Sequence, residues 1–507
     1  HTIAVDAHFE QGAQRADGLL EDRIFDLSQR LFDFIEGGGP HRNLQTRYRW
    51  ALRRPVLAVK VGKLRHPTSP GYAGAVPPRE RPWLLPLAIF VFFASLYCLT
   101  AGARLAHPSP NNHYVHLADA WLNGRLDLGP DAPGTNDWAC FDTIGRGPCP
   151  PGRYAFSNSD PERYRWYVSF PPLPAALLLP LVAVFGLNTL DVLVWTFLAA
   201  LAPMLLFVVL RSLRQKGCSD RSARDELGLT AIFGAGSVYY FVAVQGTVWF
   251  AAHVVGTVFV CLYLWAALGT RRPGLAGLAL GLAFLCRPAT IFVGSLSIVE
   301  ALSAGRRSSG TILRLLAPFA LGLLGPLAFA LWHNGVRFDD PFEFGHRFLQ
   351  IRWRDRIETW GLFSLHYLPR NMTVFFLSLP WLVADLPFIR ISRHGLALWF
   401  TTPNLLWAWP KRIDSMIAGL GLAVVLTAGC TLLYQNTGWV QFGYRFALDY
   451  MPLLFVLIAL SGRRFGRLFW VLAAFSIAVN TFGAVTFDRY PEFYDSDPTQ
   501  SVIFQPD

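Results

Sequence analysis

The chain has 507 residues, of which 53% are hydrophobic and 16% are charged, and its formal net charge is +11. A soluble protein would carry roughly a quarter charged residues, so the composition excludes the soluble globular class. Apolar runs of roughly 18–25 residues recur, long enough to cross about 30 Å of hydrocarbon. They predict an all-α, polytopic transmembrane helical bundle, and because the runs are continuous rather than alternating they exclude a transmembrane β-barrel.

The positive charge has an ordinary explanation in this class of protein. Lysine and arginine cluster at the ends of the apolar runs, as the positive-inside bias predicts. Basic residues interleaved with aromatic ones, which nucleic-acid-binding surfaces use, are not evident in the sequence. No nucleic-acid partner is therefore expected.

Residues 1–82 form the first predicted segment, on the cytoplasmic side. Its acidic first half carries apolar residues at helical spacing, which predicts an amphipathic helix: Leu20, Ile24, Leu27, Leu31 and Ile35. Residues 41–82 are basic, so the positive-inside bias places them in the cytoplasm just before a first span at about 84–104. A membrane domain is expected over 83–490 and a C-terminal tail over 491–507.

A first outer loop then covers about 105–169 and is expected to be extracytoplasmic. Cys140 and Cys149 lie in it and are candidates for a disulfide if that compartment is oxidising. The apolar run 170–186 opens with Pro171-Pro172. If it spanned, the basic residues that follow position 210 would face outside, so an interfacial or re-entrant helix is expected instead.

Further spans are predicted along the rest of the chain, giving about eleven in all. A second outer loop covers 333–369. The runs 370–388 and 395–410 are short and contain proline, so one of them is expected not to cross. The remaining expected spans are 189–210, 228–244, 247–269, 273–287, 288–303, 311–332, 413–434, 446–461 and 466–486.

The outer loops hold the residues that could carry chemistry. The first loop contains several carboxylates that could act as a general base: Asp119, Asp127, Asp131, Asp137 and Asp142. Most loop aspartates are simply solvated, but Asp119 is surrounded by apolar residues at helical spacing, which predicts a short helix at the membrane surface. Asp119 and Asp137 are the two catalytic candidates.

Candidate substrate-binding residues come from the loops and from the ends of spans: Asn112, His113, Arg125, Arg287, Tyr444, Arg445 and Asp449. A guanidinium forms paired hydrogen bonds to phosphate oxygens, so Arg445 suits a phosphate. The alternative is that Arg445 extends to the interface beside Asp449. Arg287 is either a headgroup anchor or a ligand for a lipid phosphate, and His253 is expected to be a packed residue.

Metal binding is not predicted. His113 and His116 could bind a metal or an acceptor, but the sequence contains no tight cluster of ligands. No cofactor is assigned and a divalent cation is left open.

Several short motifs together resemble the GT-C glycosyltransferases, in the branch that contains protein O-mannosyltransferases and the lipid A aminoarabinose transferase. A loop helix carries Tyr114, Ala118 and Leu122, and Pro171-Pro172-Leu173 starts the following helix. The run from Gly281 to Pro288 and the Gly-Tyr-Arg-Phe-x-Leu-Asp run ending at Asp449 also fit.

The resemblance implies transfer of a sugar from a polyprenyl-phosphate donor to an acceptor glycan, lipid or protein. The reaction would take place on the extracytoplasmic face of a membrane, expected to be a bacterial inner membrane. The chain departs from the family where an acidic pair precedes the helix, because it has Asn111-Asn112 there, and an amide cannot act as a base. Either Asp119 or another loop aspartate takes the role, or no base is needed, or the protein is inactive.

Two other classes of function compete with this interpretation. A lipid or solute transporter would place polar residues on broken helices at mid-membrane, often in two related halves, whereas here they lie in outer loops and no halves are evident. A non-catalytic membrane subunit of a larger assembly would fit the absent acidic pair. The enzyme hypothesis requires that the two outer loops and the Arg445 turn meet on one side of the bilayer and enclose a pocket.

Overall fold

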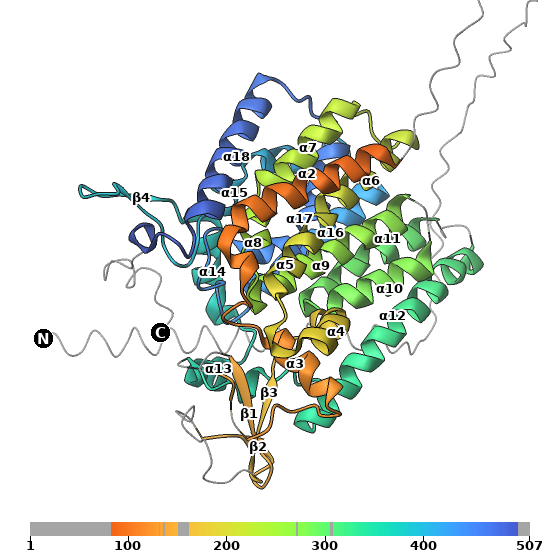
Figure 1. Cartoon of the computed structure of the whole chain (residues 1–507). Coiled ribbons are helices and arrows are strands. Elements are labelled where there is room, and N and C mark those ends of the chain that lie inside the picture. The colour runs from red at the N-terminus through yellow and green to blue at the C-terminus, as the bar shows by residue number, and fades with distance from the viewer. Residues whose placement is uncertain are drawn as a thin grey trace, which may run out of the picture. The chain divides into compact units, whose positions relative to one another are not determined.

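The computed structural model describes residues 83–494 apart from 131, 135–136, 151–161, 270–271, 305–307 and 352 (Figure 1). The predicted cytoplasmic helix, the basic stretch before the first span and most of the C-terminal tail lie outside the described residues. Most of the described chain is helical, as the sequence predicts. Its longer α-helices are α2 (Leu84–Ala101), α3 (His113–Leu122), α4 (Leu173–Phe185), α5 (Asp191–Ala199), α6 (Leu201–Gln215), α7 (Ala223–Ala235), α9 (Val248–Leu264), α10 (Pro273–Phe284), α11 (Ser295–Ala304), α12 (Ser309–Phe338), α14 (Leu368–Leu377), α16 (Ser415–Leu432), α17 (Met451–Leu460) and α18 (Arg467–Thr486).

Short helices and strands complete the described chain. The remaining α-helices are α8 (Tyr239–Ala243), α13 (Arg354–Trp360) and α15 (Leu398–Thr401). Short 3-10 helices include η4 (Pro288–Gly294), η5 (His346–Phe348), η7 (Pro403–Ala408) and η8 (Arg445–Asp449). The strands are β1 (Trp138–Asp142), β2 (Gly147–Pro148), β3 (Tyr164–Val168), β4 (Trp381–Leu382) and β5 (Ile389–Arg390).

Six helical segments in the described residues are long and apolar enough to cross a membrane. They are Leu84–Ala106, Asp191–Gln215, Val248–Leu268, Ser309–Phe338, Ser415–Leu432 and Arg467–Thr486. Their number, length and composition make the chain an integral membrane protein. The count of about eleven spans stays a prediction.

Several expected spans are shorter or broken in the structure. The run 228–244 divides into α7 and α8, and 288–303 begins as the 3-10 helix η4. Neither 370–388 nor 395–410 is a continuous helix: the first leaves α14 for the β4–β5 hairpin, and the second consists of α15 and η7. In the other direction, α12 continues to Phe338, so the second outer loop begins about six residues later than predicted.

Helices α10 and α12 approach each other closely through glycine. A side chain at Gly277 would overlap the carbonyl of Phe319, and one at Gly322 would overlap the carbonyl of Gly274. Small residues let helix backbones pack tightly in a membrane, where van der Waals contact rather than the hydrophobic effect drives association. This contact fixes α12, whose C-terminal end leads into the second outer loop.

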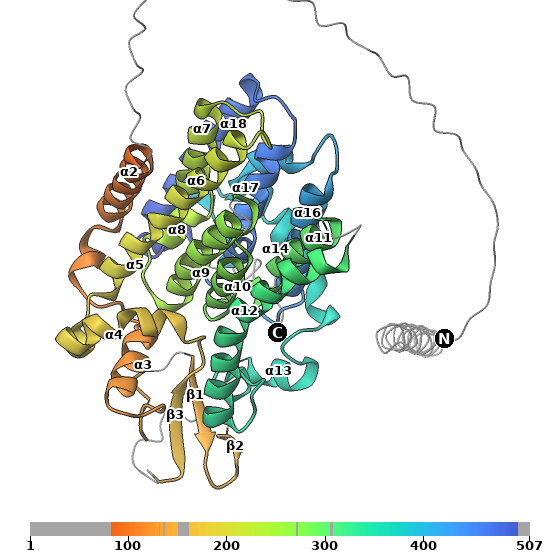
Figure 2. The same cartoon turned by 90° about the vertical axis from the view of Figure 1, so that its right-hand side faces the viewer.

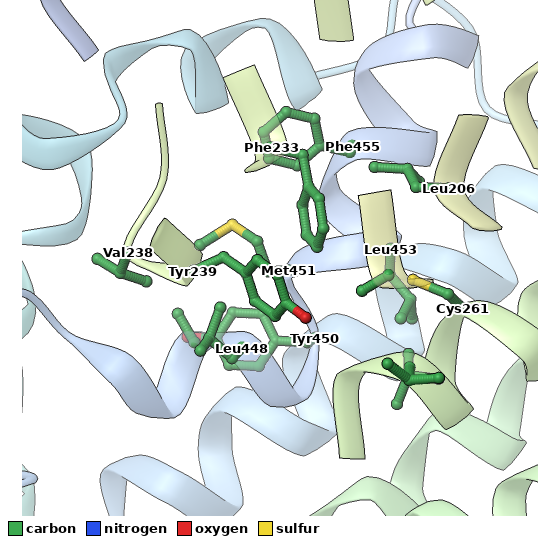
Figure 3. Packing of buried hydrophobic residues seen from close by; sticks show 14 of the residues in the cluster. Leu206, Phe233, Val238, Tyr239, Cys261, Leu448, Tyr450, Met451, Leu453 and Phe455 are labelled. Carbon is green, nitrogen blue, oxygen red and sulfur yellow. The ribbon is translucent and has the colours of Figure 1, made fainter. Parts of the chain in front are cut away.

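The hydrophobic core lies under the segment that carries Arg445. Of the six long helical segments, Val248–Leu268, which contains α9, is the most buried. Figure 3 shows Leu448, Tyr450 and Met451 packed close to Tyr239 on α8. Tyr239 stacks on Phe233 with ring centroids 5.0 Å apart. Buried contacts on this scale hold η8 and the start of α17 in one position.

The first outer loop contains a small sheet that the sequence analysis did not predict. Its strands are antiparallel in the order β2-β1-β3, with Trp138 opposite Val168. The disulfide between Cys140 and Cys149 is formed, which confirms that candidate pair. Figures 1 and 2 show β1 and β3 at the same end of the helical bundle as α3 and α13.

The two outer loops are in direct contact. Ala139 of β1 forms a β-bridge with Leu349. The carbonyl of Cys149 accepts hydrogen bonds from Gln350 Nε2 at 3.2 Å and from Arg354 Nη1 at 2.6 Å. The first and second outer loops therefore form one layer over the ends of the helices.

Candidate active site

The Arg445 segment is held by the side chain of Gln441. Its amide nitrogen donates to the carbonyls of His394 at 2.6 Å and Thr437 at 2.8 Å. Its oxygen accepts from the backbone N–H of Arg445 at 2.9 Å. These three hydrogen bonds fix the backbone at the start of η8. Every residue from Arg445 to Asp449 is buried.

Asp449, at the end of η8, is paired with Arg287. The Arg287 Nε and Nη2 atoms donate to the two carboxylate oxygens at 3.0 and 2.9 Å. His253 Nδ1 of α9 lies 3.4 Å from the same carboxylate. Arg287 is therefore the residue that forms hydrogen bonds with Asp449, while the charge of Asp449 also acts on Arg445. The alternative in which Arg445 lies beside Asp449 stays a prediction.

Arg445 is a buried cation with hydrogen-bonding capacity to spare. Arg445 is only 5% exposed. Its Nη1 donates to the carbonyls of Gly438 and Val440, while its Nε has no hydrogen-bond partner among the described residues. Burial, followed by repulsion from Arg287, lowers the pKa of Arg445 to about 9, so it remains protonated at neutral pH.

The two arginines converge on one aromatic ring. The guanidinium carbon of Arg287 lies 5.2 Å from the centroid of Phe446, and that of Arg445 lies 5.3 Å from it. Arg445 is also 5.4 Å from the ring of Phe250. All three distances fall within the range of cation–π attraction, and the two to Phe446 bring two positive charges near one ring.

Asp137 connects the first outer loop with the start of α9. Trp249, at the start of α9, donates its indole N–H to Asp137 Oδ2 at 2.6 Å. Burial raises the pKa of Asp137, although the hydrogen bond from Trp249 and the charge of Arg445 pull it back in part. A carboxylate with a raised pKa next to a buried guanidinium is an arrangement found at catalytic sites more often than elsewhere.

The second outer loop approaches Tyr434 and Arg287 through His346. Its ring centroid lies 6.3 Å from that of Tyr434, and its Nδ1 is buried without a hydrogen-bond partner among the described residues. Burial and the nearby charge of Arg287 lower the pKa of His346 to about 4, so the imidazole is neutral at pH 7. The second outer loop therefore lies close to the Arg287–Asp449 pair. That the two outer loops and the Arg445 turn share one side of the membrane and enclose a pocket stays a prediction.

Asp119 lies on α3, the short helix that the sequence predicts, and its side chain is partly exposed. Its backbone carbonyl accepts from Asn123, and its charge acts on His116. Asp137, unlike Asp119, is bonded to Trp249 beside the arginines, and its pKa responds to the charge of Arg445. A catalytic role for either residue stays a prediction.

The other predicted binding residues are distributed around the site. His113 is buried and stacks on Trp138 with centroids 3.7 Å apart, while Asn112 precedes α3 without capping it through its side chain. Tyr444 is fully buried, with its ring 5.1 Å from Phe375. Arg125 is exposed. Of the predicted set, Arg287, Arg445 and Asp449 are brought together.

Three residues around Arg287, Arg445 and Asp137 were not selected from the sequence. Trp249, Tyr434 and His346 each approach this group from a different part of the chain. Trp249 and Tyr434 stand at the ends of predicted spans, where aromatic residues are common in any membrane protein. That ordinary position gave no reason to select them.

No group of three His, Cys, Asp or Glu residues in the described parts of the chain is arranged to hold a metal ion. The divalent cation left open by the sequence therefore has no set of ligands within those parts.

Comparison with known proteins gives little further information. No protein-family model matches the chain, and no curated protein matches it. Among solved structures, the oligosaccharyltransferase of Archaeoglobus fulgidus in the apo form is similar over 82% of this chain, with 11% identity and a TM-score of 0.37. The chain spans 57% of the length of that protein. A likeness of this size supports no conclusion about activity, so the case for a function depends on the site itself.

Proposed function

We propose that the chain is a glycosyltransferase of the bacterial inner membrane that uses a polyprenyl-phosphate sugar as donor. It would transfer the sugar to an acceptor glycan, lipid or protein on the extracytoplasmic face. The single observation that carries the proposal is that Asp137, from the first outer loop, is bonded to Trp249 at 2.6 Å, and the next residue, Phe250, has its ring 5.4 Å from the buried Arg445 guanidinium. A base and a phosphate-binding cation are the two groups that this transfer requires.

Arg445 binds the phosphate of the donor in this proposal. Its Nε has no hydrogen-bond partner among the described residues, and a guanidinium fixed in a buried setting would stabilise a phosphate that reaches it more strongly than one in water. Arg287 lies near Phe446 as well and adds a second positive charge, while its pairing with Asp449 fixes its position. The lipid tail would extend along the apolar helices.

Asp137 acts as the general base. The acceptor hydroxyl oxygen attacks C1 of the donor sugar and forms the new glycosidic bond. The bond from C1 to the phosphate oxygen breaks, and the polyprenyl phosphate leaves with the electron pair, stabilised by Arg445. The hydroxyl proton passes to the carboxylate of Asp137, whose raised pKa makes it a stronger base than an ordinary aspartate.

A transfer assay tests the proposal. Purified full-length protein in lipid nanodiscs is incubated with radiolabelled mannosyl, glucosyl and aminoarabinosyl polyprenyl phosphates and with glycan, lipid and peptide acceptors. We expect label to move to one acceptor class, and Asp137→Asn to lower the rate by roughly 100-fold or more. Asp385→Asn, at an exposed position in the β4–β5 hairpin, is the control and should retain activity. Asp119→Asn tests the other catalytic candidate, and a larger loss there than in Asp137→Asn would transfer the role of base to Asp119. Absence of transfer from every donor would contradict the proposal.

A further inference from the structure

A cavity lies between the two outer loops and shares His346 with the surroundings of the candidate site. Its volume is about 510 Å³, within the range of about 300–1,000 Å³ typical of small-molecule sites. Pro148 of the first outer loop lines one wall, and the rest of the lining comes from the second loop and α13. Nothing in the proposed roles of Asp137 and Arg445 uses this space.

Two lining residues connect the cavity with the candidate site. His346 lines it and also contacts the ring of Tyr434, and its pKa responds to the charge of Arg287. Phe344 lines it and packs its ring 6.0 Å from that of Phe284, three positions before Arg287. A molecule in the cavity would therefore lie next to the proposed phosphate site.

The charged groups around the cavity balance. Arg354 donates to Glu358 at 2.7 Å, and Glu343 accepts from the backbone N–H of Gly345 at 2.7 Å. Burial raises the pKa of Glu343, and the bond from Gly345 and the charge of Arg347 oppose that rise in part. Among the described residues of the lining, two cations therefore face two carboxylates, so these residues give no net charge to attract an ion. It retains many groups that can exchange hydrogen bonds with hydroxyls.

The lining also offers aromatic surface and an unused polar atom. Phe342 is 79% exposed and Phe344 is partly exposed, so their rings are available to the apolar face of a ligand. His346 Nδ1 is buried and has no hydrogen-bond partner among the described residues. It is a hydrogen-bonding group at the boundary between the cavity and the arginines.

We propose that this cavity binds the acceptor and that the acceptor presents a neutral, hydroxyl-rich carbohydrate to the site. The inference rests on the proposed glycosyltransferase function and specifies its acceptor class. Balanced charges disfavour a strongly ionic ligand, while exposed rings and many polar groups suit a sugar ring with its apolar face and its hydroxyls. One hydroxyl would point past His346 toward the donor sugar.

Saturation-transfer NMR on full-length protein in nanodiscs, with polyprenyl phosphate present, tests this inference. The probes are the neutral saccharides mannotriose and maltotriose, with mannose 6-phosphate as the anionic comparison. We expect a neutral saccharide to bind the wild type, and Phe342→Ala to weaken it roughly tenfold. Because Phe342 is so exposed, its loss should leave the fold intact. Phe388→Ala, in the β4–β5 hairpin and 54% exposed, is the matched control.

The outcomes separate the two proposals. The carbohydrate inference is overturned if no neutral saccharide binds, if mannose 6-phosphate binds more tightly than the neutral probes, or if Phe388→Ala weakens binding as much as Phe342→Ala does. Polyprenyl phosphate binding, measured separately, should be unchanged in Phe342→Ala. If that lipid binds and the saccharides do not, the acceptor inference alone fails. If the saccharides bind and the lipid does not, the proposed donor site fails and the cavity cannot serve as its acceptor site.

Discussion

Arg287 and Asp449 are 162 positions apart in the chain and share two hydrogen bonds, at 3.0 and 2.9 Å. The Asp449 side chain is only 2% exposed and that of Arg287 is 22% exposed. The pair joins the break after α10 to the end of η8. Since Arg445 begins η8, this pairing also fixes the residue proposed to bind phosphate.

Removing one partner of this pair should destabilise the protein. Asp449→Asn leaves the largely buried charge of Arg287 without its partner. We expect a cost of about 3 kcal/mol, at the low end for a buried ion pair, because Arg287 is partly exposed. The apparent unfolding temperature, followed by intrinsic fluorescence, should fall clearly below that of the wild type. Asp488→Asn is the control, because its side chain is 72% exposed. Equal unfolding temperatures for the two variants would show that the pair has no such role.

The transfer rate should depend on pH through Asp137. A general base must be ionised, so kcat/KM should fall as the pH drops through the pKa of Asp137, which burial raises above its ordinary value. Trp249→Phe removes a hydrogen bond that favours the charged carboxylate, so the acid limb of the profile should move to higher pH. Trp332→Phe, at an exposed position, should leave the profile unchanged. If the acid limb does not move in Trp249→Phe, the indole of Trp249 has no role in setting the pKa of Asp137.

Donor binding should depend on Arg445. Arg445→Gln removes a hydrogen-bonding charge, so the affinity for polyprenyl phosphate should fall roughly tenfold or more. Arg445→Lys keeps the charge but loses the planar fork, so it should bind with intermediate affinity. Arg412→Gln, at an exposed position outside the candidate site, should bind like the wild type. Lipid binding by equilibrium titration measures all three, and a normal affinity in Arg445→Gln would exclude it as the phosphate ligand.

The Cys140–Cys149 disulfide should stabilise the outer layer. A cross-link that closes a loop of this length contributes about 2–3 kcal/mol, and the carbonyl of Cys149 also accepts from Arg354. The double variant Cys140→Ser/Cys149→Ser should have a lower unfolding temperature than the wild type. Reductant should lower the unfolding temperature of the wild type but not that of the double variant. Cys218→Ser, at an exposed free thiol, should change neither. A reductant effect that persists in the double variant would contradict this assignment.

The helical framework could be predicted because it depends on local composition. Apolar runs long enough to cross a membrane gave the helical class, and helical spacing around Asp119 gave α3. The disulfide was visible as two cysteines in one polar loop. Helix breaks were harder to foresee: the run 228–244 reads as one apolar stretch, yet it divides at Gly236.

The candidate site could be predicted only in part, because its contacts are distant in sequence. The pairing of Arg287 with Asp449 and the bond from Trp249 to Asp137 depend on how helices pack, which no local pattern encodes. The β1–β3 pair was missed although β3 alternates between buried and half-buried residues, a signal that five residues carry weakly. Asp119 attracted attention by its helix, whereas the hydrogen bond to Trp249, next to the Phe250 ring that faces Arg445, belongs to Asp137.

The central claim is that Asp137 and Arg445 act on the same substrate, and a double-mutant cycle in kcat/KM for sugar transfer tests it most directly. The wild type, Asp137→Asn, Arg445→Gln and the double variant are compared at one pH with the same donor and acceptor. If the two residues act as a unit, each single change should remove most of the activity and the double variant should lose much less than the product of the two effects. Strictly multiplicative losses, or full activity in Asp137→Asn, would contradict the account.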